Sequence, residues 1–402
     1  MPDAADVAIV GGGPAGAALA TRLAQAGVRT LLFERQREPV WRACGVFSSP
    51  LTRQRLVELG MSADEVAALA RPISALRIET LGGSACRIEY ERGHANGFDR
   101  VRLDAALLEQ ARHAGAEVRT ATVVRSVNLP TRRGDYAWLE VSPTVTAGRG
   151  DRRTIKARIV VGADGSGSMV AGAAGVAGER SRLWKIGLTY HRSDPVAAPS
   201  GEPMEGRFVF GRGWYAGIAP VPAARVNVGI VLPGRWIAPA PGAIAERLLG
   251  RFPGPPEPWM SAPMTDDYRS AGTLEYRPRK VAGNGFVLVG DAAGFIDPLT
   301  GEGLHRALVS SEFATDAISR SLRGDQNALE VYDRRLRSRF LAKDVVSWVF
   351  QVFIAQPAVL DYALRRLARR HRQRKTLTLV LTDQIRASRA LDPRFLTRLL
   401  AP

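Results

Sequence analysis

The sequence predicts an α/β protein in which a parallel sheet is covered by helices, interrupted by an antiparallel sheet and followed by a helical C-terminal region. Three observations indicate this fold class. Residues 7–34 combine an apolar strand, a glycine-rich turn, a helix and a second strand. Residues 286–307 repeat the strand, turn and helix far along the chain. Between these units apolar and polar residues alternate and Gly and Pro cluster, which is typical of antiparallel strands joined by turns.

The first strand and turn have the chemistry of a dinucleotide-binding site. Val7 to Val10 is an apolar run typical of a buried parallel strand, and Gly11, Gly13 and Gly16 follow it at G-x-G-x-x-G spacing. The glycines allow a sharp turn and a close approach to a pyrophosphate, which the helix N-terminus attracts. Glu34 ends the next strand, where its carboxylate can accept hydrogen bonds from a ribose. A purely structural glycine turn is the alternative.

The second strand and turn predict a contact with a different part of the cofactor. Asp291 lies just after the apolar strand 286–289, at the end where open α/β sheets bind ligands, and its carboxylate can accept hydrogen bonds from ribityl hydroxyls. Gly301 and Gly303 then shape a loop that opens a helix at about Leu304, whose free N–H groups would face the pyrimidine edge of a flavin. Two such sites in this order predict one long cofactor, FAD, held at both ends. A capped turn in a generic α/β domain is the alternative.

Three motifs make the chain resemble a known flavoprotein superfamily. They are GGGPAG at 11–16, GADGSGS at 162–168 and GDAAGFIDPLTGEG at 290–303. In these motifs and their order the chain is similar to the superfamily that contains the aromatic-ring hydroxylases and the geranylgeranyl reductases. The resemblance implies a Rossmann-like FAD-binding domain of the glutathione-reductase type, with an inserted antiparallel β-sheet substrate domain.

The resemblance also assigns roles to single residues. It implies that Asp164 lies near the flavin pyrophosphate, where the family also receives NADH or NADPH, that Arg100 lies near the FAD phosphates and that Val124 lies beside the adenine. The complete set of residues predicted to bind FAD is Gly11, Gly13, Pro14, Ala15, Gly16, Glu34, Arg35, Arg42, Cys44, Gly45, Arg100, Val124, Asp164, Gly165, Gly290, Asp291, Pro298, Gly301, Glu302, Gly303 and Leu304.

Two departures from the hydroxylases favour the reductase branch. Hydroxylases carry His after GDAA and Gln between the last two glycines, whereas this chain has Gly294 and Glu302, as the reductases do. The segment RACGVFSSP at 42–50 resembles a reductase segment, which implies that Cys44 lies beside the isoalloxazine.

The predicted substrate residues come from a later stretch, WYAGIAPVP, which resembles the substrate-sheet motif of the reductases. They are Trp214, Tyr215 and Pro220, although the two aromatic residues can equally fill the core of the sheet. Gly217 and Ala219 stand where the prenyl-reducing enzymes have bulky Trp and Phe. This departure predicts a wider or reshaped pocket.

The leading functional prediction is an FAD-dependent oxidoreductase in which hydride passes from reduced FAD to a carbon–carbon double bond of an isoprenoid, lipid or polyketide substrate. Cys44 and Glu302 are the candidate proton donors, with packing against the ring and stabilisation of a helix start as their alternatives. Since no second complete dinucleotide turn is present, NADH or NADPH would bind only transiently, or a separate electron donor would act. The other hypotheses are an NAD(P)H-dependent flavin monooxygenase of aromatic or polyketide substrates and a non-catalytic flavin-binding partner protein.

Length and composition agree with an intracellular enzyme of two lobes and a tail. The 402 residues are 46% apolar and contain two cysteines without C-x-x-C spacing, so a disulfide framework is not expected and no metal site is predicted. The N-terminus has acidic residues where a secretory signal would be basic, which predicts a cytoplasmic location, with peripheral membrane attachment as the alternative. We predict an FAD-binding domain from 1–75, 98–180 and 272–325, an antiparallel-sheet substrate domain from 76–97 and 183–270, and a basic helical region from 326–402.

The net charge of +17 is concentrated near the C-terminus, in RRLARRHRQRK at 365–375. A solvated helix face is the simplest interpretation, and contact with a membrane surface or an acidic carrier is the alternative. Nucleic acid is not expected, because no recognition motif accompanies the basic residues. The apolar stretch from Val345 is interrupted by Gln and Pro and is shorter than a bilayer span of about 20 residues, so we expect a helix that packs on the core or lines a substrate entrance.

Overall fold

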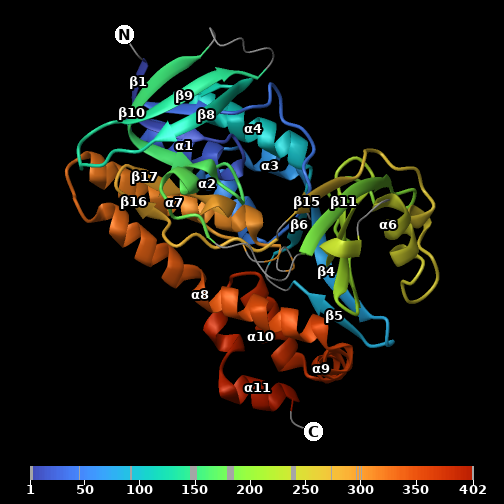
Figure 1. Ribbon diagram of the computed structural model, residues 1–402. Coiled ribbons are helices and arrows are strands. Elements are labelled where there is room, and N and C mark those ends of the chain that lie inside the picture. Colours follow the sequence, from blue (N-terminus) through green and yellow to red (C-terminus); the bar gives the residue numbers. More distant parts are fainter. Residues whose placement is uncertain are drawn as a thin grey trace.

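The computed structural model describes residues 3–44, 46–90, 93–144, 152–178, 185–236, 241–272, 274–295, 297, 299 and 301–400. These residues form two sheets and a C-terminal group of helices (Figure 1). The predicted site residues Gly45 and Pro298 lie outside the described residues. The fold class predicted from the sequence, an FAD-binding α/β domain with a second sheet and a helical C-terminus, is confirmed.

The first sheet has eight strands, and its central strands are parallel. The path runs through β16 (Ala282–Gly283), β17 (Phe286–Leu288), β10 (Arg153–Gly162), β1 (Asp3–Val10), β2 (Thr30–Phe33) and β7 (Glu117–Arg119), and an antiparallel extension adds β9 (Ala137–Pro143) and β8 (Thr122–Asn128). Every residue of β2 is buried, as expected for a parallel strand covered on both faces.

Helices pack on this sheet through its main hydrophobic core. The helices of this domain are α1 (Pro14–Gln25), α2 (Leu51–Glu58), α3 (Ala63–Ala68), α4 (Arg100–His113), α5 (Met169–Ala173) and α7 (Gly303–Leu322). Helix α1 packs against both α4 and α7. Small buried residues such as Ala17, Ala18 and Ala20 allow these close contacts. The packing brings the start of α7 beside the start of α1, although 289 residues separate Pro14 from Gly303 in the sequence.

The second sheet has nine strands and lies beside the first (Figure 1). Its path is β15 (Arg269–Gly272), β11 (Lys185–Ser193), β14 (Arg225–Pro233), β13 (Trp214–Val221), β12 (Met204–Gly211), β4 (Ala70–Thr80), β6 (Ala95–Phe98) and β3 (Phe47–Ser48), with β5 (Ala85–Glu89) on β4. Helix α6 (Pro241–Leu249) belongs to the hydrophobic core of this sheet.

Two details of the second sheet differ from the prediction. The pair β12 and β4 is parallel, because these strands come from the two separate insertions and the chain returns through the first domain between them. In addition, β4 begins at Ala70, six residues before the predicted start at 76, and the short strand β3 also joins this sheet.

The C-terminal region consists of α8 (Ala328–Ala355), α9 (Pro357–Arg369), α10 (His371–Leu381) and α11 (Pro393–Leu400). Helix α8 packs against α7, and α9 packs against β4 and β5, so this region contacts both sheets (Figure 1). The chain bends sharply at Gln356, which has extended backbone angles because the following Pro357 disfavours the helical conformation. The basic run 365–375 is therefore divided between α9 and α10 at Arg370.

Candidate cofactor site

Three strand ends and the turns that follow them meet at one edge of the first sheet. Strands β17, β10 and β1 are neighbours and parallel, so their carboxyl ends lie side by side. The Ala163 N–H donates to the Val10 carbonyl at 2.8 Å, which joins the second motif to the first. A Cβ placed on Gly290 would lie 2.7 Å from the Cβ of Ala15, so the third motif touches the first. This edge is where open α/β sheets bind ligands.

The glycines of the first turn have separate roles. A Cβ on Gly11 would lie 2.4 Å from the Ala163 carbonyl oxygen, and one on Gly16 would lie 2.0 Å from the Gly11 oxygen, so both positions need glycine for packing. Gly13 differs, because a Cβ there would meet no atom within 4 Å. Gly13 caps the N-terminus of α1 without a side-chain hydrogen bond, so its open side faces the free N–H groups of the helix. This cradle fits a pyrophosphate.

Glu34 is buried and holds the first turn in place. One carboxylate oxygen accepts the Gly12 N–H at 2.8 Å, and the other accepts the Gln36 N–H at 3.0 Å and a guanidinium N–H of Arg42 at 2.9 Å. A carboxylate has about four acceptor positions, so capacity for a ribose hydroxyl remains. The predicted ribose contact stays a prediction, and the structure adds a second role that the sequence did not reveal.

Two further residues predicted to bind FAD lie near Glu34. The side chain of Arg35 is exposed, while its carbonyl accepts a hydrogen bond from the Thr144 hydroxyl at 2.5 Å. Val124 is buried in β8, whose first residue Thr122 donates its N–H to the Glu34 carbonyl at 3.0 Å. Strand β8 thus runs alongside the end of β2, as the expected adenine contact requires.

Asp164, in the second motif, has an oxygen without a partner. One carboxylate oxygen accepts the Met169 N–H at 2.8 Å and caps the short helix α5, whereas Oδ1 is buried and has no hydrogen bond. Burial raises the pKa of this carboxyl group, and hydrogen bonds from Ser168 and the start of α5 counteract the shift. The neighbouring Gly165 has a φ of +83° and open space around it. An unpaired buried oxygen beside the glycine turn fits a site that accepts a polar ligand group.

Arg100 connects Cys44 to the third motif. The guanidinium donates to the Cys44 sulfur at 2.8 Å and forms an ion pair with Asp104 at 3.1 Å. The Asp291 side chain is exposed at the end of β17, and the charges of Arg306 and Arg100 act on it. The expected contact of Arg100 with the FAD phosphates stays a prediction.

The loop after Asp291 has one tightly packed glycine and one open glycine. Gly301 has a φ of +62°, and a Cβ there would lie 2.2 Å from the Phe47 ring. Gly303, the first residue of α7, has no atom within 4 Å of such a Cβ, and the following Leu304 is buried. Gly303 and Gly13 are thus open positions at two helix starts that pack together, and a long cofactor can bind against both.

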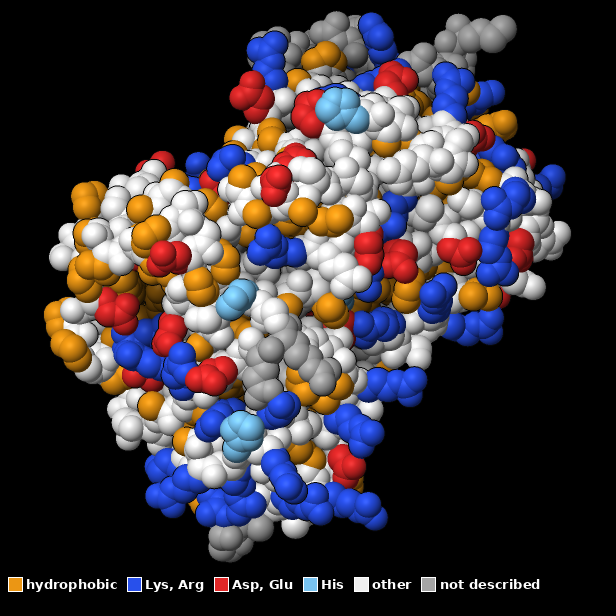
Figure 2. Space-filling model, turned by 180° about the vertical axis from the view of Figure 1, so that it is seen from behind, with side chains coloured by type: hydrophobic (Ala, Val, Ile, Leu, Met, Phe, Trp, Pro, Cys, Tyr) orange, Lys and Arg blue, Asp and Glu red, His pale blue; other side chains and the backbone are white. Residues whose placement is uncertain are grey.

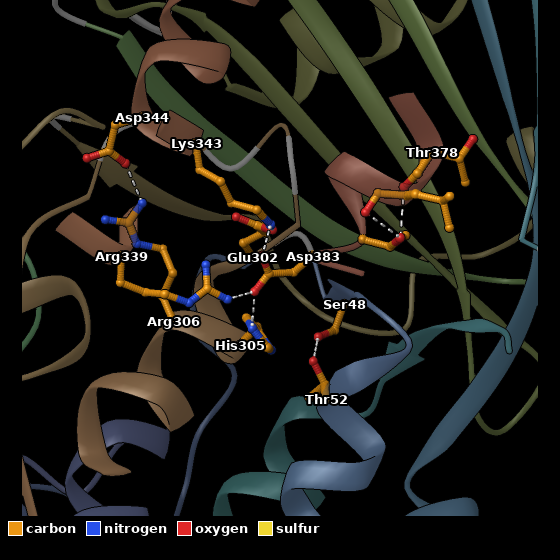
Figure 3. Close-up of polar contacts among 12 residues, drawn as sticks. Ser48, Thr52, Glu302, His305, Arg306, Arg339, Lys343, Asp344, Thr378 and Asp383 are labelled. Atoms are coloured by element: carbon orange, nitrogen blue, oxygen red, sulfur yellow. Dashed lines mark hydrogen bonds and ion pairs between the residues drawn. The ribbon is translucent and has the colours of Figure 1, made fainter. Parts of the chain in front are cut away.

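A group of five buried or half-buried charged and polar side chains lies directly behind this loop (Figure 3). We call it the buried charge cluster, and it consists of Glu302, His305, Arg339, Lys343 and Asp383. Lys343 forms ion pairs with Glu302 and, at 3.2 Å, with Asp383. The other oxygen of Asp383 accepts from His305 Nε2 at 2.7 Å and from the Arg339 guanidinium. Helices α7 and α8 and the residues after α10 therefore meet at Asp383 (Figure 3).

Electrostatics favour the charged form of Asp383. Burial alone would raise the pKa of its carboxyl group, but the hydrogen bond from His305 and the charges of Lys343 and Arg339 hold the pKa well below its usual range. Burial lowers the pKa of Lys343 to about 8, against the opposing effect of Asp383. Glu302 points at Lys343 in this cluster and is 3% exposed. This geometry favours a positioning role for Glu302 over proton donation.

The predicted substrate residues face opposite sides of β13. Trp214 is buried in the core beneath α6, so of its two expected roles the structure shows core packing. Tyr215 points to the other face, where its hydroxyl donates to Asp297 at 2.5 Å in the loop that follows Asp291. Pro220 also lies on β13, and its carbonyl oxygen packs against Gly97.

Phe208 occupies the space that Gly217 leaves. A Cβ on Gly217 would lie 2.8 Å from the Phe208 ring, so the missing large side chain is replaced from the neighbouring strand. The rings of Phe208, Phe210 and Tyr215 lie within about 6 Å of one another, at centroid distances of 5.7 to 6.1 Å. The space at Gly217 is therefore filled by Phe208, and the wider or reshaped substrate pocket stays a prediction.

Sequence reasoning missed several residues of the site. His305 was not among the predicted residues, and it is fully buried against Asp383. Asp297 lies within the third motif but was given no role, and Lys343 and Asp383 gave no local signal, because their partners are distant in the sequence. Among the described residues, no group of three or more His, Cys, Asp or Glu side chains is arranged to hold a metal ion.

The residues present fit FAD. Two open glycines lie at adjoining helix starts, Asp164 has an unpaired buried oxygen, and Asp291 offers a carboxylate at the end of β17. These features, together with the parallel sheet, define the protein as an FAD-binding oxidoreductase. The residues that would hold the cofactor are those of the first turn and Glu34 at one end, and Asp291 and Gly303 at the other.

Comparisons with known proteins agree. A family model described as "FAD binding domain" matches residues 4–201. The digeranylgeranylglycerophospholipid reductase of Methanosarcina acetivorans is 29% identical over 360 residues, which cover 84% of this chain and 81% of the relative. The chloroplastic geranylgeranyl diphosphate reductase of Oryza sativa is 28% identical, and the match covers 85% of this chain and 72% of the relative. Residues 4–201 therefore match an FAD-binding domain, and the chain is similar to geranylgeranyl reductases over more than four fifths of its length.

Solved structures show the same fold. A geranylgeranyl bacteriochlorophyll reductase-like protein from Thermoplasma acidophilum is similar with a TM-score of 0.79 at 22% identity, and the match covers 98% of this chain and 100% of that one. The flavin-dependent brominase Bmp2 is similar with a TM-score of 0.76 at 20% identity, over 94% and 93% of the two chains.

Proposed function

We propose that this protein is an FAD-dependent reductase that saturates carbon–carbon double bonds of a hydrophobic, isoprenoid-containing substrate. The observation that carries the proposal is the similarity to geranylgeranyl reductases over more than four fifths of this chain. Two positions support the reductase branch, Gly294 and Glu302, where hydroxylases of the superfamily have His and Gln. Glu302 is used structurally here, since its pairing with Lys343 ties the loop to α8.

The chain has an aromatic cluster that an isoprenoid chain would approach, and two groups that would deliver a proton. FAD, when bound, supplies the hydride. Phe208, Phe210 and Tyr215 form a cluster of aromatic rings on the second sheet. Burial, together with Asp297, raises the pKa of Tyr215 well above its usual value, which makes the hydroxyl a weaker acid, and the proton that it would deliver is the one that it donates to Asp297.

Cys44 is the second candidate proton donor. Its sulfur is half-buried and accepts hydrogen bonds from Arg100 at 2.8 Å and from the Val46 N–H at 3.3 Å, which fix its direction. The Thr189 hydroxyl donates to the Cys44 carbonyl at 3.2 Å and holds this segment against the second sheet. Cys44 thus lies where the first domain meets the sheet that carries Tyr215. The reductant proposed is NADH or NADPH, which would bind transiently.

The test uses the purified FAD-loaded protein under anaerobic conditions, with geranylgeranyl-bearing phospholipid as substrate and dithionite or NADPH as reductant. Mass spectrometry should show products that gain hydrogen in pairs. The Tyr215→Phe and Cys44→Ser variants should retain FAD but form product more slowly, and the residue that delivers the proton should show the larger loss.

Two other results would assign a different function. A product that contains an added oxygen atom, formed only in air, would identify a monooxygenase. FAD that is reduced and reoxidised without any change in aromatic, polyketide or isoprenoid substrates would indicate a non-catalytic flavin-binding protein.

A further inference from the structure

The outer face of α8 and α9 is apolar and exposed. Leu341 is 64% exposed, Val352 is 53% exposed and Trp348 is 47% exposed, although helices of this kind normally bury such residues. We call the following set the apolar stripe: Leu341, Val345, Trp348, Val349, Val352, Val359 and Tyr362. All residues from 341 to 362 are described, and none of the exposed ones is charged.

The second half of α8, from Leu341 onward, differs from an ordinary surface helix, whereas the first half exposes Arg334, Arg335 and Arg337 in the usual way. In the second half, the charged residue Lys343 points inward to the buried charge cluster, and Asp344 forms an ion pair with Arg306 at 2.6 Å. Leu341, Val345, Trp348 and Val352 are spaced by four, three and four residues, so they form one continuous line along the opposite side. The inner face thus packs on the protein, and the side chains of the outer line remain 41% to 64% exposed.

A basic surface continues the apolar stripe. On α9 the exposed face passes from Val359 and Tyr362 to Arg365 and Arg369, which follow at helical spacing. Residues 326–402 contain 16 Lys or Arg and 6 Asp or Glu, a net charge of +10 out of the +17 of the whole chain. Figure 2 shows Lys and Arg side chains gathered at the end of the molecule that carries these C-terminal helices.

Helices α8 and α9 meet at an angle of 116°. Among the described residues, no single helix is both long and apolar enough to cross a bilayer, and this pair reaches the required length and composition only when its two helices are counted together. Both helices also bury a full face against the protein, with Leu336 and Phe340 in one core and Leu360 and Leu364 in another. These helices bury one face in the protein, expose apolar side chains on the other and are flanked by cations. This arrangement is typical of helices that lie in the interface of a membrane.

We propose that the apolar stripe and the basic surface beyond it dock this protein on the surface of an anionic phospholipid bilayer. The stripe would enter the boundary between headgroups and acyl chains, and the arginines would meet the phosphates. A second copy of the chain is a poorer occupant, because it would bring the same excess of positive charge against this one. The proposal concerns a surface outside the cofactor site and does not depend on the proposed reaction.

The test is co-sedimentation of the full-length FAD-loaded protein with vesicles. The wild type should bind vesicles of phosphatidylcholine mixed with phosphatidylglycerol, and should bind pure phosphatidylcholine far less. The variant Trp348→Glu/Val352→Glu should bind roughly tenfold more weakly, because carboxylates replace two side chains that enter the interface. Arg369→Glu/Arg372→Glu should also lose about tenfold, and added salt should weaken the wild type.

The matched control is Trp138→Glu. Trp138 is 42% exposed, close to the value for Trp348, but it lies on β9, at the far end of the molecule from the C-terminal helices (Figure 1). This variant should bind vesicles like the wild type. All variants should keep bound FAD and the wild-type melting temperature, because each altered side chain is exposed.

Three results would overturn the proposal. The first is equal binding to neutral and anionic vesicles by the wild type. The second is an equal loss for the Trp138 and Trp348 variants. The third is a wild type that does not bind vesicles but is dimeric in solution, with the Trp348→Glu/Val352→Glu variant monomeric, since this would identify the stripe as an interface between copies of the chain.

Discussion

Asp383 allows the sharpest test of the buried charge cluster, through the substitution Asp383→Asn. The two side chains have the same shape, so no cavity is introduced. One oxygen of Asp383 accepts from His305 and Arg339, and the other faces Lys343. An amide has one acceptor oxygen and one donor nitrogen, so in either orientation the Asn side chain places a donor against a donor.

The size of the expected loss in stability follows from the burial of both charged side chains. The side chains of Asp383 and Lys343 are 3% and 6% exposed, so Lys343 cannot replace the lost carboxylate with water. Removing one partner of a buried ion pair costs about 3–5 kcal/mol. Glu302 remains beside Lys343, so we expect a loss near the lower end, about 3 kcal/mol in free energy of unfolding at neutral pH. The same substitution at Asp316, whose contact with Arg320 is exposed at 3.7 Å, should cost no more than about 1 kcal/mol.

The assay is urea unfolding of the FAD-loaded protein, combined with hydrogen exchange of the backbone amides in α8 and α10. The pKa of Asp383 is depressed in the folded state, so its carboxylate stabilises the fold above its unfolded pKa of about 3.9 and this contribution is lost as the pH falls toward the folded pKa. The difference between the wild type and Asp383→Asn should therefore be constant near neutral pH and shrink in acid. If Asp383→Asn costs no more than Asp316→Asn, or if the difference does not change in acid, the cluster does not hold these helices together.

Three other predictions concern the cofactor site. The Asp291→Ala variant should purify without FAD, measured by visible absorbance, because the carboxylate at the end of β17 is lost; a fully yellow variant would contradict the assigned ribityl contact. Gly13→Val should also lose FAD while the apoprotein keeps its melting temperature, since a Cβ there meets nothing within 4 Å. Gly16→Val should instead fail to fold, because its Cβ would lie 2.0 Å from a carbonyl oxygen. Asp297→Asn should keep FAD but slow product formation about tenfold, since it removes the charged partner of Tyr215; unchanged turnover would exclude this pair from the reaction.

Local sequence predicted the parts of the site that depend on the local backbone. The spacing of Gly11, Gly13 and Gly16 fixes a turn whose shape depends on a few neighbouring residues, and the helix at the second site begins at Gly303, one residue before the predicted start. The second sheet was also predictable in outline, because alternation and turn residues act over short distances. The parallel pairing of β12 with β4 was not, because it depends on how two distant insertions meet in space.

The residues behind the flavin loop could not be identified by the same reasoning. Lys343 lies in an apolar helix, where pattern analysis places a charged residue on the exposed side, yet the structure buries it and exposes Leu341 and Trp348 instead. The burial of Lys343 is explained by Glu302 and Asp383 on the facing elements, because two buried carboxylates require a cation between them. A hydrophobic pattern reports how apolar each face is but not which face has a partner. In this protein the second half of α8 turns Lys343 and Asp344 toward the protein, and its exposed side chains from Leu341 to Val352 are available for a surface outside the chain.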